Sequence, residues 1–253
     1  MNIVSWNVNS LNVRLAHVLD LLREQAPDIV ALQETKTPDE RFPRDALRDA
    51  GYEVAFSGQK TYNGVAILSR QPILDIETRL PGMADDPQRR LLAATIGGLR
   101  VVNVYIPNGQ AVGSDKYAYK MRWLAALEPY LADQLSRYPA LVLLGDFNIA
   151  PADIDVHDPA RWRGKIMCSD EERAWFQRLL ALGLKDAPRT RHPDKPMFSW
   201  WDYRLNAYRR GWGLRIDHIL TSGDLIVRDA GVDVGMRERE RPSDHAPVWV
   251  ELA

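Results

Sequence analysis

The chain has 253 residues and a formal net charge of −1, with 45% hydrophobic and 26% charged residues. This composition is ordinary for a globular protein, and no apolar run is long enough to suggest a membrane span. The small net charge excludes a protein that attracts polyanions through its overall charge, so any contact with nucleic acid must be local.

We expect a single domain over residues 1–253, because sandwiches and barrels of this length fold as one unit. The N-terminal sequence MNIVSWNV lacks the basic and apolar regions of a signal peptide. The only cysteine, Cys168, cannot form an internal disulfide, which agrees with a reducing compartment. These features predict a cytoplasmic protein without a membrane partner, and we expect a monomer.

The N-terminal region is expected to alternate strand, helix and strand. Residues 2–6 (NIVSW) predict a buried strand, which ends in the polar residues Asn7 and Asn9. Apolar residues then recur at helical spacing at Leu15, Val18, Leu19 and Leu22. A second strand is predicted at residues 28–32, with Glu34 at its exit. Both strands therefore end in polar side chains.

The next region is expected to be rich in strands. Residues 51–106 contain the apolar runs YEVAF, GVAILS, LLAATI and LRVVNVYI, separated by turn signals. We interpret these runs as a largely antiparallel meander. The last run ends at Tyr105, and Asn108 follows it. Residues 116–137 have apolar residues on one face at helical spacing, which predicts a helix.

Residues 140–151, ALVLLGDFNIAP, hold the most informative stretch. Its unbroken apolar run is typical of a strand buried on both faces. On a chain that is still roughly extended, Asp146 and Asn148 should project to the same side, with Phe147 turned away. A carboxylate and a carboxamide on a rigid strand end suit proton transfer or metal binding. An ordinary turn rich in Asp and Asn is the alternative interpretation.

One more helix and two long loops are expected after this strand. Ser169 and Glu172 have the spacing of a capping box, and Gly183 supplies a plausible helix end. The segments 151–169 and 186–212 are rich in Pro and Arg, and loops of such length in a compact domain tend to be functional.

The C-terminal strands also carry polar residues at their ends. The run GLRIDHIL predicts a strand in which Asp217 and His218 point to opposite faces. The last strand, APVWVEL, follows Asp244 and His245. A carboxylate can fix the tautomer of an imidazole and support its charged form, so either Asp217 or Asp244 could orient His245.

Basic residues cluster in the second half of the chain and alternate with aromatic ones. The basic clusters are Arg161, Arg163 and Lys165; Arg189, Arg191, His192 and Lys195; and Arg204, Arg209, Arg210 and Arg215. The aromatic residues among them are Trp162, Trp200, Trp201, Tyr203, Tyr208 and Trp212. Solvated loop charge would explain any one cluster, but charge combined with stacking rings suits nucleic acid.

The polar strand ends can form one site if two sheets pack face to face with helices outside. The residues concerned are Asn7, Asn9, Glu34, Tyr105, Asn108, Asp146, Asn148, Asp217, Asp244 and His245. Glu34 with nearby Asp or Asn oxygens is a reasonable seat for Mg²⁺, a hard ion that prefers oxygen ligands.

Several motifs together resemble the exonuclease III family of DNA-repair nucleases, in the endonuclease/exonuclease/phosphatase superfamily. These motifs are SWNVN, ALQETK, VNVYIPNG, LLGDFNIAP, FSWWDYR, GWGLRIDHIL and SDHAPV, in family order along the whole chain. The resemblance implies a single α/β domain, a four-layer α/β sandwich of two packed, mostly antiparallel sheets flanked by helices.

The resemblance also implies roles for individual residues. Glu34 would be the principal Mg²⁺ ligand, with Mn²⁺ as a substitute ion. The metal-site residues would be Asn7, Glu34, Asp146, Asn148, Asp244 and His245. The catalytic residues would be Tyr105, Asp146, Asn148, Asp217 and His245. Asp146 would handle the proton of the attacking water or the leaving group, and Asp217 would orient His245. Asn9 replaces an Asp found in some relatives, which makes a second metal site doubtful.

By the same resemblance, the substrate would be duplex DNA with abasic sites or damaged 3′ ends. The substrate-binding residues would be Asn108, Lys116, Trp200, Trp212 and Ile216, and the last three match a pocket for an abasic deoxyribose that excludes a normal nucleotide. The implied activities are hydrolysis of the phosphodiester 5′ to an abasic site, 3′→5′ exonuclease action and cleaning of 3′ ends.

Three alternatives are open at this point. A phosphatase of the same superfamily would share the catalytic residues, although the FSWWDYR segment argues against it. A non-catalytic nucleic-acid-binding regulator would need only the basic and aromatic residues. An ordinary layered α/β protein without any shared site would be left if the strand ends did not meet in space.

Overall fold

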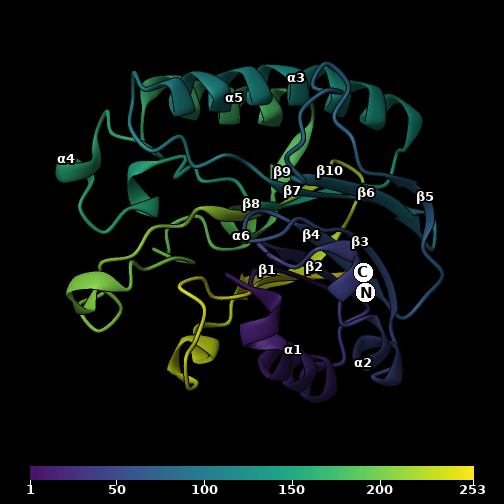
Figure 1. Ribbon diagram of the computed structural model, residues 1–253. Helices are drawn as coiled ribbons and strands as arrows, with labels where there is room; N and C mark the ends of the chain where they lie inside the picture. Colours follow the sequence, from purple (N-terminus) through teal and green to yellow (C-terminus); the bar gives the residue numbers. More distant parts are fainter.

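The structure is a computed structural model that describes residues 1–253. Two six-stranded sheets pack face to face, and helices cover the outer face of each sheet (Figure 1). The layers from bottom to top of Figure 1 are helices α1 and α2, the first sheet, the second sheet, and helices α3 and α5. This arrangement confirms the predicted four-layer α/β sandwich.

The first sheet has the strand order β11-β12-β1-β2-β4-β3. Its strands are Val227–Val232 (β11), Val248–Leu252 (β12), Asn2–Asn7 (β1), Ile29–Gln33 (β2), Val65–Ser69 (β4) and Glu53–Ser57 (β3). The second sheet has the order β5-β6-β7-β8-β10-β9. Its strands are Leu74–Glu77 (β5), Leu91–Ile96 (β6), Leu99–Tyr105 (β7), Leu141–Asp146 (β8), Asp217–Ser222 (β10) and Leu184–Asp186 (β9).

The helices connect and cover these strands. The α-helices are Leu11–Gln25 (α1), Arg44–Asp49 (α2), Asp115–Arg137 (α3), Pro159–Trp162 (α4), Asp170–Ala181 (α5) and Ala187–Arg191 (α6). Four short 3₁₀ turns lie at Asp39–Arg41 (η1), Asp153–Asp155 (η2), Arg204–Asn206 (η3) and Val234–Glu238 (η4). None of these helices combines the length and the apolar character that a membrane crossing requires.

Each sheet contains one parallel pair of strands among antiparallel ones. The parallel pairs are β1 with β2, joined through α1, and β7 with β8, joined through α3. Because parallel strands end at the same edge, the two pairs carry four strand ends to one side of the molecule. This edge lies at the left of Figure 1, whereas the N- and C-termini lie together at the right.

The core explains the unbroken apolar runs in the sequence. In β8, Val142 and Leu144 pack between the two sheets, whereas Leu141 and Leu143 pack against the helical layer of α3 and α5. Both faces of the strand are therefore buried, as the run of residues 140–144 predicts. A third cluster lies between the first sheet and helices α1 and α2.

The expected single meander over residues 51–106 is wrong in one respect. The predicted strands are present and their neighbours are antiparallel, but β3 and β4 belong to the first sheet while β5, β6 and β7 belong to the second. The chain changes sheets after β4, so β4 and β6 pack on each other across the interior instead of pairing edge to edge. The apolar pattern is the same in both arrangements, because both bury these strands.

The predicted helices agree with the structure at their capping residues. Ser169 and Glu172 form a capping box at the start of α5: the Glu172 N–H donates to Ser169 Oγ (3.2 Å), and the Ser169 N–H donates to Glu172 Oε2 (3.0 Å). Gly183 follows the helix with a positive φ of 98°, which glycine adopts without strain. Helix α3 begins at Asp115, one residue before the predicted start.

Candidate active site

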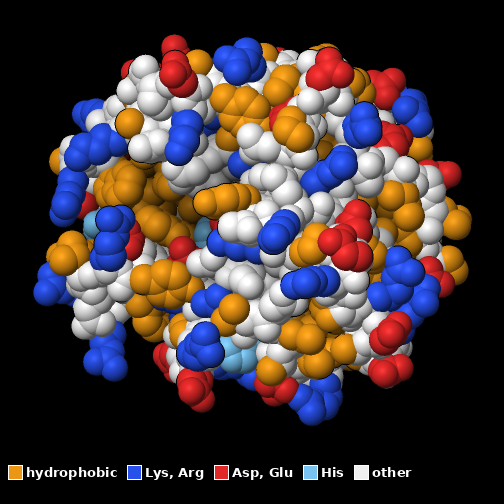
Figure 2. Space-filling model, in the orientation of Figure 1, with side chains coloured by type: hydrophobic (Ala, Val, Ile, Leu, Met, Phe, Trp, Pro, Cys, Tyr) orange, Lys and Arg blue, Asp and Glu red, His pale blue; other side chains and the backbone are white.

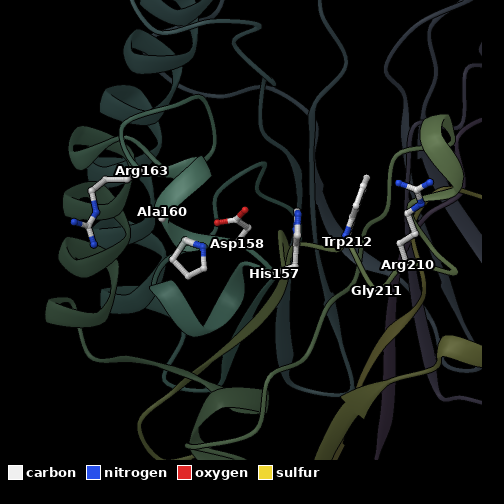
Figure 3. Close-up of a pocket in the computed structure, with 8 residues that line it drawn as sticks. His157, Asp158, Ala160, Arg163, Arg210, Gly211 and Trp212 are labelled. Carbon is white, nitrogen blue, oxygen red and sulfur yellow. The ribbon is translucent and has the colours of Figure 1, made fainter.

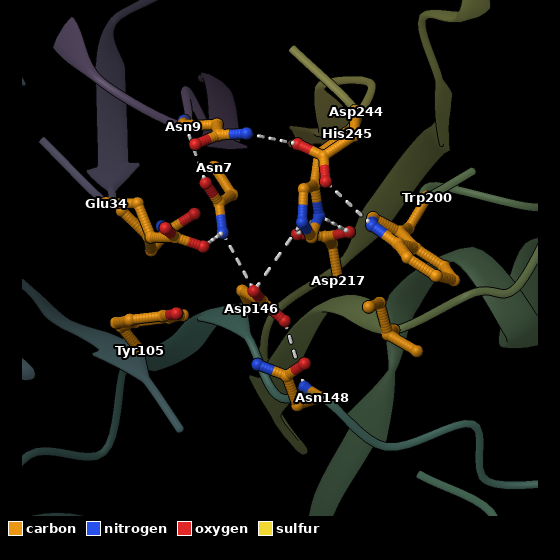
Figure 4. A network of polar contacts seen from close by, with 12 residues as sticks. Asn7, Asn9, Glu34, Tyr105, Asp146, Asn148, Trp200, Asp217, Asp244 and His245 are labelled. Carbon is orange, nitrogen blue, oxygen red and sulfur yellow. Dashed lines mark hydrogen bonds and ion pairs between the residues drawn. The ribbon is translucent and has the colours of Figure 1, made fainter. Parts of the chain in front are cut away.

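Side chains from both sheets meet at the shared edge. Asn7, at the end of β1, donates one amide hydrogen to Glu34 Oε1 (2.9 Å) and the other to Asp146 Oδ2 (2.8 Å) (Figure 4). Glu34 follows β2 of the same sheet, whereas Asp146 ends β8 of the other. The predicted convergence of strand ends is therefore found, and the interpretation as a layered protein without a shared site is wrong.

Strand register places the remaining members of the second sheet. Tyr105 of β7 and Asp217 of β10 are the direct neighbours of Asp146 on its two sides. Neighbouring strands lie about 5 Å apart, so these three side chains share one rim. Tyr105 and Asp217 consequently flank the carboxylate that Asn7 holds.

Three of the polar residues have a strained backbone, and Asn9 is one of them, with a φ of 44°. Glu34 and Asn148 both have a φ of 51°, in the left-handed region. Such a conformation costs on the order of 1–3 kcal/mol and tends to occur at functional sites. At Asn148 it means that the chain is no longer extended, contrary to the expectation, and the Asn148 N–H donates to Asp146 Oδ1 (2.9 Å). The segment is thus both an Asp-Asn turn and part of the site.

His245 is paired with Asp217. Its Nδ1 donates to the Asp217 carboxylate at 2.9 Å (Oδ2) and 3.1 Å (Oδ1), and its Nε2 lies 3.8 Å from Asp146 Oδ2. Ser199 Oγ holds the same carboxylate by donating to Asp217 Oδ2 (2.6 Å). Asp244 instead accepts from Asn9 Nδ2 (2.9 Å) and Trp200 Nε1 (3.0 Å). Of the two candidates for orienting His245, Asp217 is therefore the one in contact with its imidazole.

Burial and charge shift the pKa values of this pair in complementary directions. Burial raises the pKa of Asp146 to about 7, and the carboxylates of Asp217 and Glu34 add to the effect, whereas His245 opposes it. Burial alone would lower the pKa of His245, but the Asp217 and Asp146 carboxylates outweigh it and raise this pKa to about 10. The site therefore holds a carboxyl group that titrates near neutral pH next to an imidazolium.

Glu34 and Tyr105 remain in their ordinary charge states. Burial would raise the pKa of Glu34, but the Lys36 ammonium at 2.8 Å and the amide of Asn7 lower it overall. Burial and the nearby Glu34 charge raise the pKa of Tyr105 well above its ordinary value. Glu34 is therefore a carboxylate and Tyr105 a neutral hydroxyl group.

Glu34, Asp146 and His245 form the one cluster of acidic and imidazole groups with metal-site spacing: their ligand atoms all lie within 4.8 Å of one another. The two carboxylates fit a hard cation, and the charge that His245 carries makes it a poorer ligand than they are. Asn7 turns its NH₂ group to both carboxylates, and its oxygen accepts from the Asn9 N–H (3.0 Å). Asp244 lies outside the cluster.

Asn148 and Asn108 form a pair of carboxamides beside Asp146. Asn108 Nδ2 donates to Asn148 Oδ1 (2.9 Å), and Asn148 Nδ2 donates to the carbonyl of Ile106 (3.0 Å). Each amide nitrogen carries two hydrogens, so each has one more to donate. The buried Lys120 donates to the main-chain carbonyl of Asn148 (2.8 Å).

A cleft opens beside the polar cluster. One cavity of about 630 Å³ is lined by Trp162, Trp200 and Trp212, together with Arg161 and Arg204. A second cavity, of about 800 Å³, adjoins it at Trp212 and has the rim residues His157, Asp158, Arg163 and Arg210 (Figure 3). We call these two cavities the cleft. Figure 2 shows a hollow on this side, floored by hydrophobic side chains and ringed by Lys and Arg.

The expected substrate-binding residues differ in how they meet the cleft. Trp200 and Trp212 line it, but Ile216 is only 1% exposed and packs in a small cluster behind Trp200. Asn108 belongs to the carboxamide pair. Lys116 is exposed on the first turn of α3 and makes no contact with the polar cluster.

Two of the arginines expected in a nucleic-acid surface turn inward. Arg215 is 1% exposed and pairs with Asp155 (2.7 Å) and Asp186 (2.8 Å), and Arg189 also pairs with Asp155 (2.6 Å). The interpretation of Arg215 as phosphate-binding charge is wrong, because its guanidinium group is buried between carboxylate partners. Arg189 is half-buried, and its guanidinium group is directed at Asp155.

Sequence reasoning missed several residues that support the site. Ser199 holds Asp217, and Ser243 Oγ accepts from the His245 N–H (3.2 Å) and donates to the Asn7 carbonyl (2.7 Å). Trp6 Nε1 donates to the His245 carbonyl (3.0 Å). Each lies inside a quoted motif, so motif membership was the signal that could have identified them.

Comparisons with known proteins agree with this architecture. Residues 4–245 match the model of the endonuclease/exonuclease/phosphatase family. The chain is 37% identical to exodeoxyribonuclease III of Haemophilus influenzae, over 100% of both chains. Among solved structures, the 3′ phosphatase NExo from Neisseria bound to a product DNA hairpin is 52% identical with a TM-score of 0.99, covering 100% of this chain and 99% of that one. An AP endonuclease from Archaeoglobus fulgidus is 37% identical with a TM-score of 0.95, at the same coverage.

Proposed function

The chain belongs to the endonuclease/exonuclease/phosphatase family, and we propose that it is a Mg²⁺-dependent DNA-repair nuclease. Its relatives make it a phosphodiester hydrolase of the exodeoxyribonuclease III type. The proposed substrates are duplex DNA with abasic sites, cleaved 5′ to the lesion, and DNA with 3′ ends that carry phosphate groups or removable nucleotides. The same site serves each of them, because each requires water to attack a phosphate ester.

One observation supports this proposal above the others. Glu34, Asp146 and His245 come from three distant parts of the chain, yet their ligand atoms lie within 4.8 Å at the edge of a cleft lined with tryptophan and arginine. Carboxylates and an imidazolium suit phosphate hydrolysis, and flat rings with guanidinium groups suit DNA.

Asp146 is proposed to take the proton of the attacking water. In the metal-free protein, burial and the neighbouring carboxylates raise its pKa to about 7, so the carboxylate is basic enough to accept a proton near neutral pH. The bonds from Asn7 and from the Asn148 N–H fix the carboxylate in one orientation. The water can then be aligned with the phosphorus before it reacts.

His245 and the carboxamides are proposed to bind the phosphate oxygens. The Asp217 carboxylate keeps His245 charged and oriented, so its Nε2–H can donate to a non-bridging oxygen. Asn148 and Asn108 each have one amide hydrogen left for this purpose, and the neutral Tyr105 hydroxyl group adds another donor. Such fixed donors stabilise the charge that builds up in the transition state.

Glu34, with Asp146 next to it, is proposed to hold Mg²⁺, and Mn²⁺ should substitute. A bound Mg²⁺ would neutralise charge on the phosphate and so favour attack by water. Asn7 keeps the two carboxylates together by donating to both. The cluster contains a single such group of carboxylates, which supports one metal ion rather than two.

The cleft is proposed to receive the damaged end of the DNA. Its inner cavity, about 630 Å³, lies in the usual range for small-molecule sites and has more room than one sugar ring needs. Trp200 connects it to the polar cluster through its bond to Asp244. The blunt-end substrate tests whether this cavity excludes a normal nucleotide, as the family resemblance implies.

The test is hydrolysis of three duplex substrates with Mg²⁺: an abasic site, a 3′-phosphate and a blunt end. Glu34→Ala and Asp146→Asn should each lower the rate by about 100-fold or more, because each removes a transition-state contact of about 3 kcal/mol. Both variants should keep the wild-type circular dichroism spectrum. Full activity in either variant would overturn these roles.

The alternatives are tested in the same assay. A soluble phosphomonoester, offered in parallel, identifies a small-molecule phosphatase if it is hydrolysed in preference to DNA. If the protein binds DNA but shows no EDTA-sensitive hydrolysis, it is a non-catalytic regulator. The monomeric state and the cytoplasmic location stay predictions.

A further inference from the structure

We propose that Lys120 is a positioning residue for the reaction, holding the carboxamides of Asn108 and Asn148 where they can donate to the scissile phosphate. This inference rests on the proposed function, since it assigns a support to groups of that site. Lys120 lies on α3, away from every motif used to recognise the catalytic residues.

Lys120 cannot contact DNA itself. Its side chain is fully buried, and the ammonium nitrogen has three partners inside the protein. It donates to the carbonyl of Asn148 (2.8 Å), approaches the carbonyl of Asn108 (3.4 Å), and pairs with the carboxylate of Glu172. A buried lysine is costly unless its charge is compensated, so its place in the structure calls for a specific role.

The two carbonyls belong to the two residues whose amides face the site. Asn148 has a φ of 51°, and Asn108 leans on it through the bond from its Nδ2 to Asn148 Oδ1 (2.9 Å). The ammonium bond holds the main chain in this strained turn. Without it, the Asn148 carbonyl would be a buried acceptor without its donor, and the turn could relax.

Glu172 fixes the ammonium from the other side. Its Oε1 also accepts from the Met167 N–H (3.1 Å), and its Oε2 accepts from the N–H of Ser169 (3.0 Å) at the start of α5. The pair thus links α3, α5 and the turn at Asn148. The stem of Lys120 packs on Gly109, where an added Cβ would lie 3.1 Å from Lys120 Cδ.

The main test variant is K120M/E172Q, which removes both charges together and leaves no unpaired buried ion. A displacement of the carboxamides by about 1 Å should lower kcat by about 10- to 100-fold on a 3′-phosphate duplex, with KM nearly unchanged. E172Q alone keeps the ammonium bond to Asn148 and should lower kcat by less than about 3-fold. K120M alone is the second variant if the double one folds poorly: it also removes the bond to Asn148, while Glu172 keeps its bonds from the Met167 and Ser169 N–H groups, and kcat should fall by about the same 10- to 100-fold.

The matched control is R100M. Like Lys120, Arg100 is fully buried and pairs with a carboxylate, that of Glu77 (2.7 Å). It lies near the start of β7 in the second sheet, whereas Tyr105 of the active site ends that strand. We expect R100M to lower the melting temperature without changing kcat. An equal fall of kcat in R100M and K120M/E172Q would show a general loss of stability and overturn the proposal.

A double-mutant cycle with N148A tests whether Lys120 acts through Asn148. In the N148A background, K120M/E172Q should cost less than about 2-fold further in kcat, because the Asn148 carboxamide is absent and Asn108 has already lost the Asn148 oxygen to which it donates. If K120M/E172Q lowers kcat by the same factor in the N148A background as in the wild type, the proposal is overturned. The side-chain NH₂ signals of Asn108 and Asn148 in ¹⁵N NMR spectra should shift in K120M/E172Q and stay in place in R100M.

The two proposals fail in different ways. A wild-type protein that hydrolyses none of the DNA substrates overturns the proposed function, and the role of Lys120 with it. An active wild type with an unchanged kcat in K120M/E172Q overturns the role of Lys120 alone.

Discussion

At the scale of single residues, the pairing of His245 with Asp217 gives the site its charge. Two carboxylates keep the imidazole protonated although it is buried, and the pKa of His245 rises to about 10. Burial, with the carboxylates of Asp217 and Glu34, raises the pKa of Asp146 to about 7. One cluster therefore contains a proton acceptor and a cation at neutral pH, which hydrolysis of a phosphate ester needs together.

Asp217→Asn should move the alkaline limit of activity to lower pH. The neutral amide no longer favours the charged imidazole, so burial lowers the pKa of His245, and the donor is lost at a pH where the wild type still has it. We expect the descending limb of kcat against pH to shift down by at least about one unit. Steady-state rates between about pH 6 and pH 10 check this, and an unchanged limb would contradict the role of His245.

The charged and amide residues of the site could be predicted one by one, but their supports could not. Glu34, Asp146 and His245 follow predicted strands and lie inside motifs that resemble the exonuclease III family, and this signal is visible in a single sequence. Lys120 is a common residue type outside every quoted motif, and only its partners in space distinguish it from a surface residue. No spacing along the chain encodes those partners.

At the scale of elements, boundaries follow local rules whereas sheet membership does not. The capping box of α5 depends on four neighbouring residues, so Ser169 and Glu172 predict the helix start directly. The assignment of β3 to β7 to two sheets depends on which strands face each other across the core. Both arrangements bury the same apolar residues, so the pattern alone could not decide between them.

Ser169→Ala should destabilise the protein by about 1 kcal/mol, because it removes the side-chain cap of α5. Urea unfolding followed by circular dichroism measures the change in the free energy of unfolding. Ser136→Ala is the control: Ser136 is exposed near the end of α3 and donates only to a local carbonyl. We expect a change of less than about 0.5 kcal/mol there, and equal effects at both positions would contradict the capping role.

Strand β10 should make stability depend on acid through His218. Its Nε2 donates to the Ile149 carbonyl (2.8 Å) and its Nδ1 accepts from Arg215 (3.2 Å), so both nitrogens are used by the neutral form. Burial, with the Arg215 charge, lowers the pKa of His218 to about 4. The unfolded chain therefore takes up a proton before the folded one as the pH falls from about 6.5 to about 4.

The resulting loss should be about 2 kcal/mol by about pH 5 and about 3 kcal/mol by about pH 4. Urea unfolding at these pH values and at about pH 7.5 gives the comparison. His218→Gln keeps a donor and an acceptor but does not titrate, so its stability should fall less steeply over this range. Parallel pH dependences of wild type and variant would show that other groups cause the loss.

At the scale of the whole molecule, the distribution of charge matters more than its sum. The net charge is −1, yet Arg161, Arg163, Arg204 and Arg210 all surround the cleft. The sequence predicted that basic residues cluster locally, and several of them do surround the cleft. It could not show that Arg189 and Arg215 instead pair with carboxylates of the fold. Only the partners Asp155 and Asp186, brought close by folding, decide that.

The double variant R163A/R210A should raise KM for duplex DNA and leave kcat nearly unchanged, because these side chains contact the cleft and not the polar cluster. The slope of the logarithm of the DNA-binding constant against the logarithm of the salt concentration should become less negative by about one to two. Arg137→Ala is the control, since Arg137 lies at the far end of α3 and pairs with Asp133. A KM that stays constant in R163A/R210A would exclude a DNA contact there.

The junction that Asn7 makes between Glu34 and Asp146 has a consequence for inactivation. Its halves belong to separate sheets, so a slight sliding of one sheet over the other separates the reacting groups while every strand stays intact. The turnover rate should therefore respond to a relative displacement of the two sheets that is too small to change their secondary structure. On heating, the enzyme should lose activity several degrees below the temperature at which circular dichroism first detects unfolding.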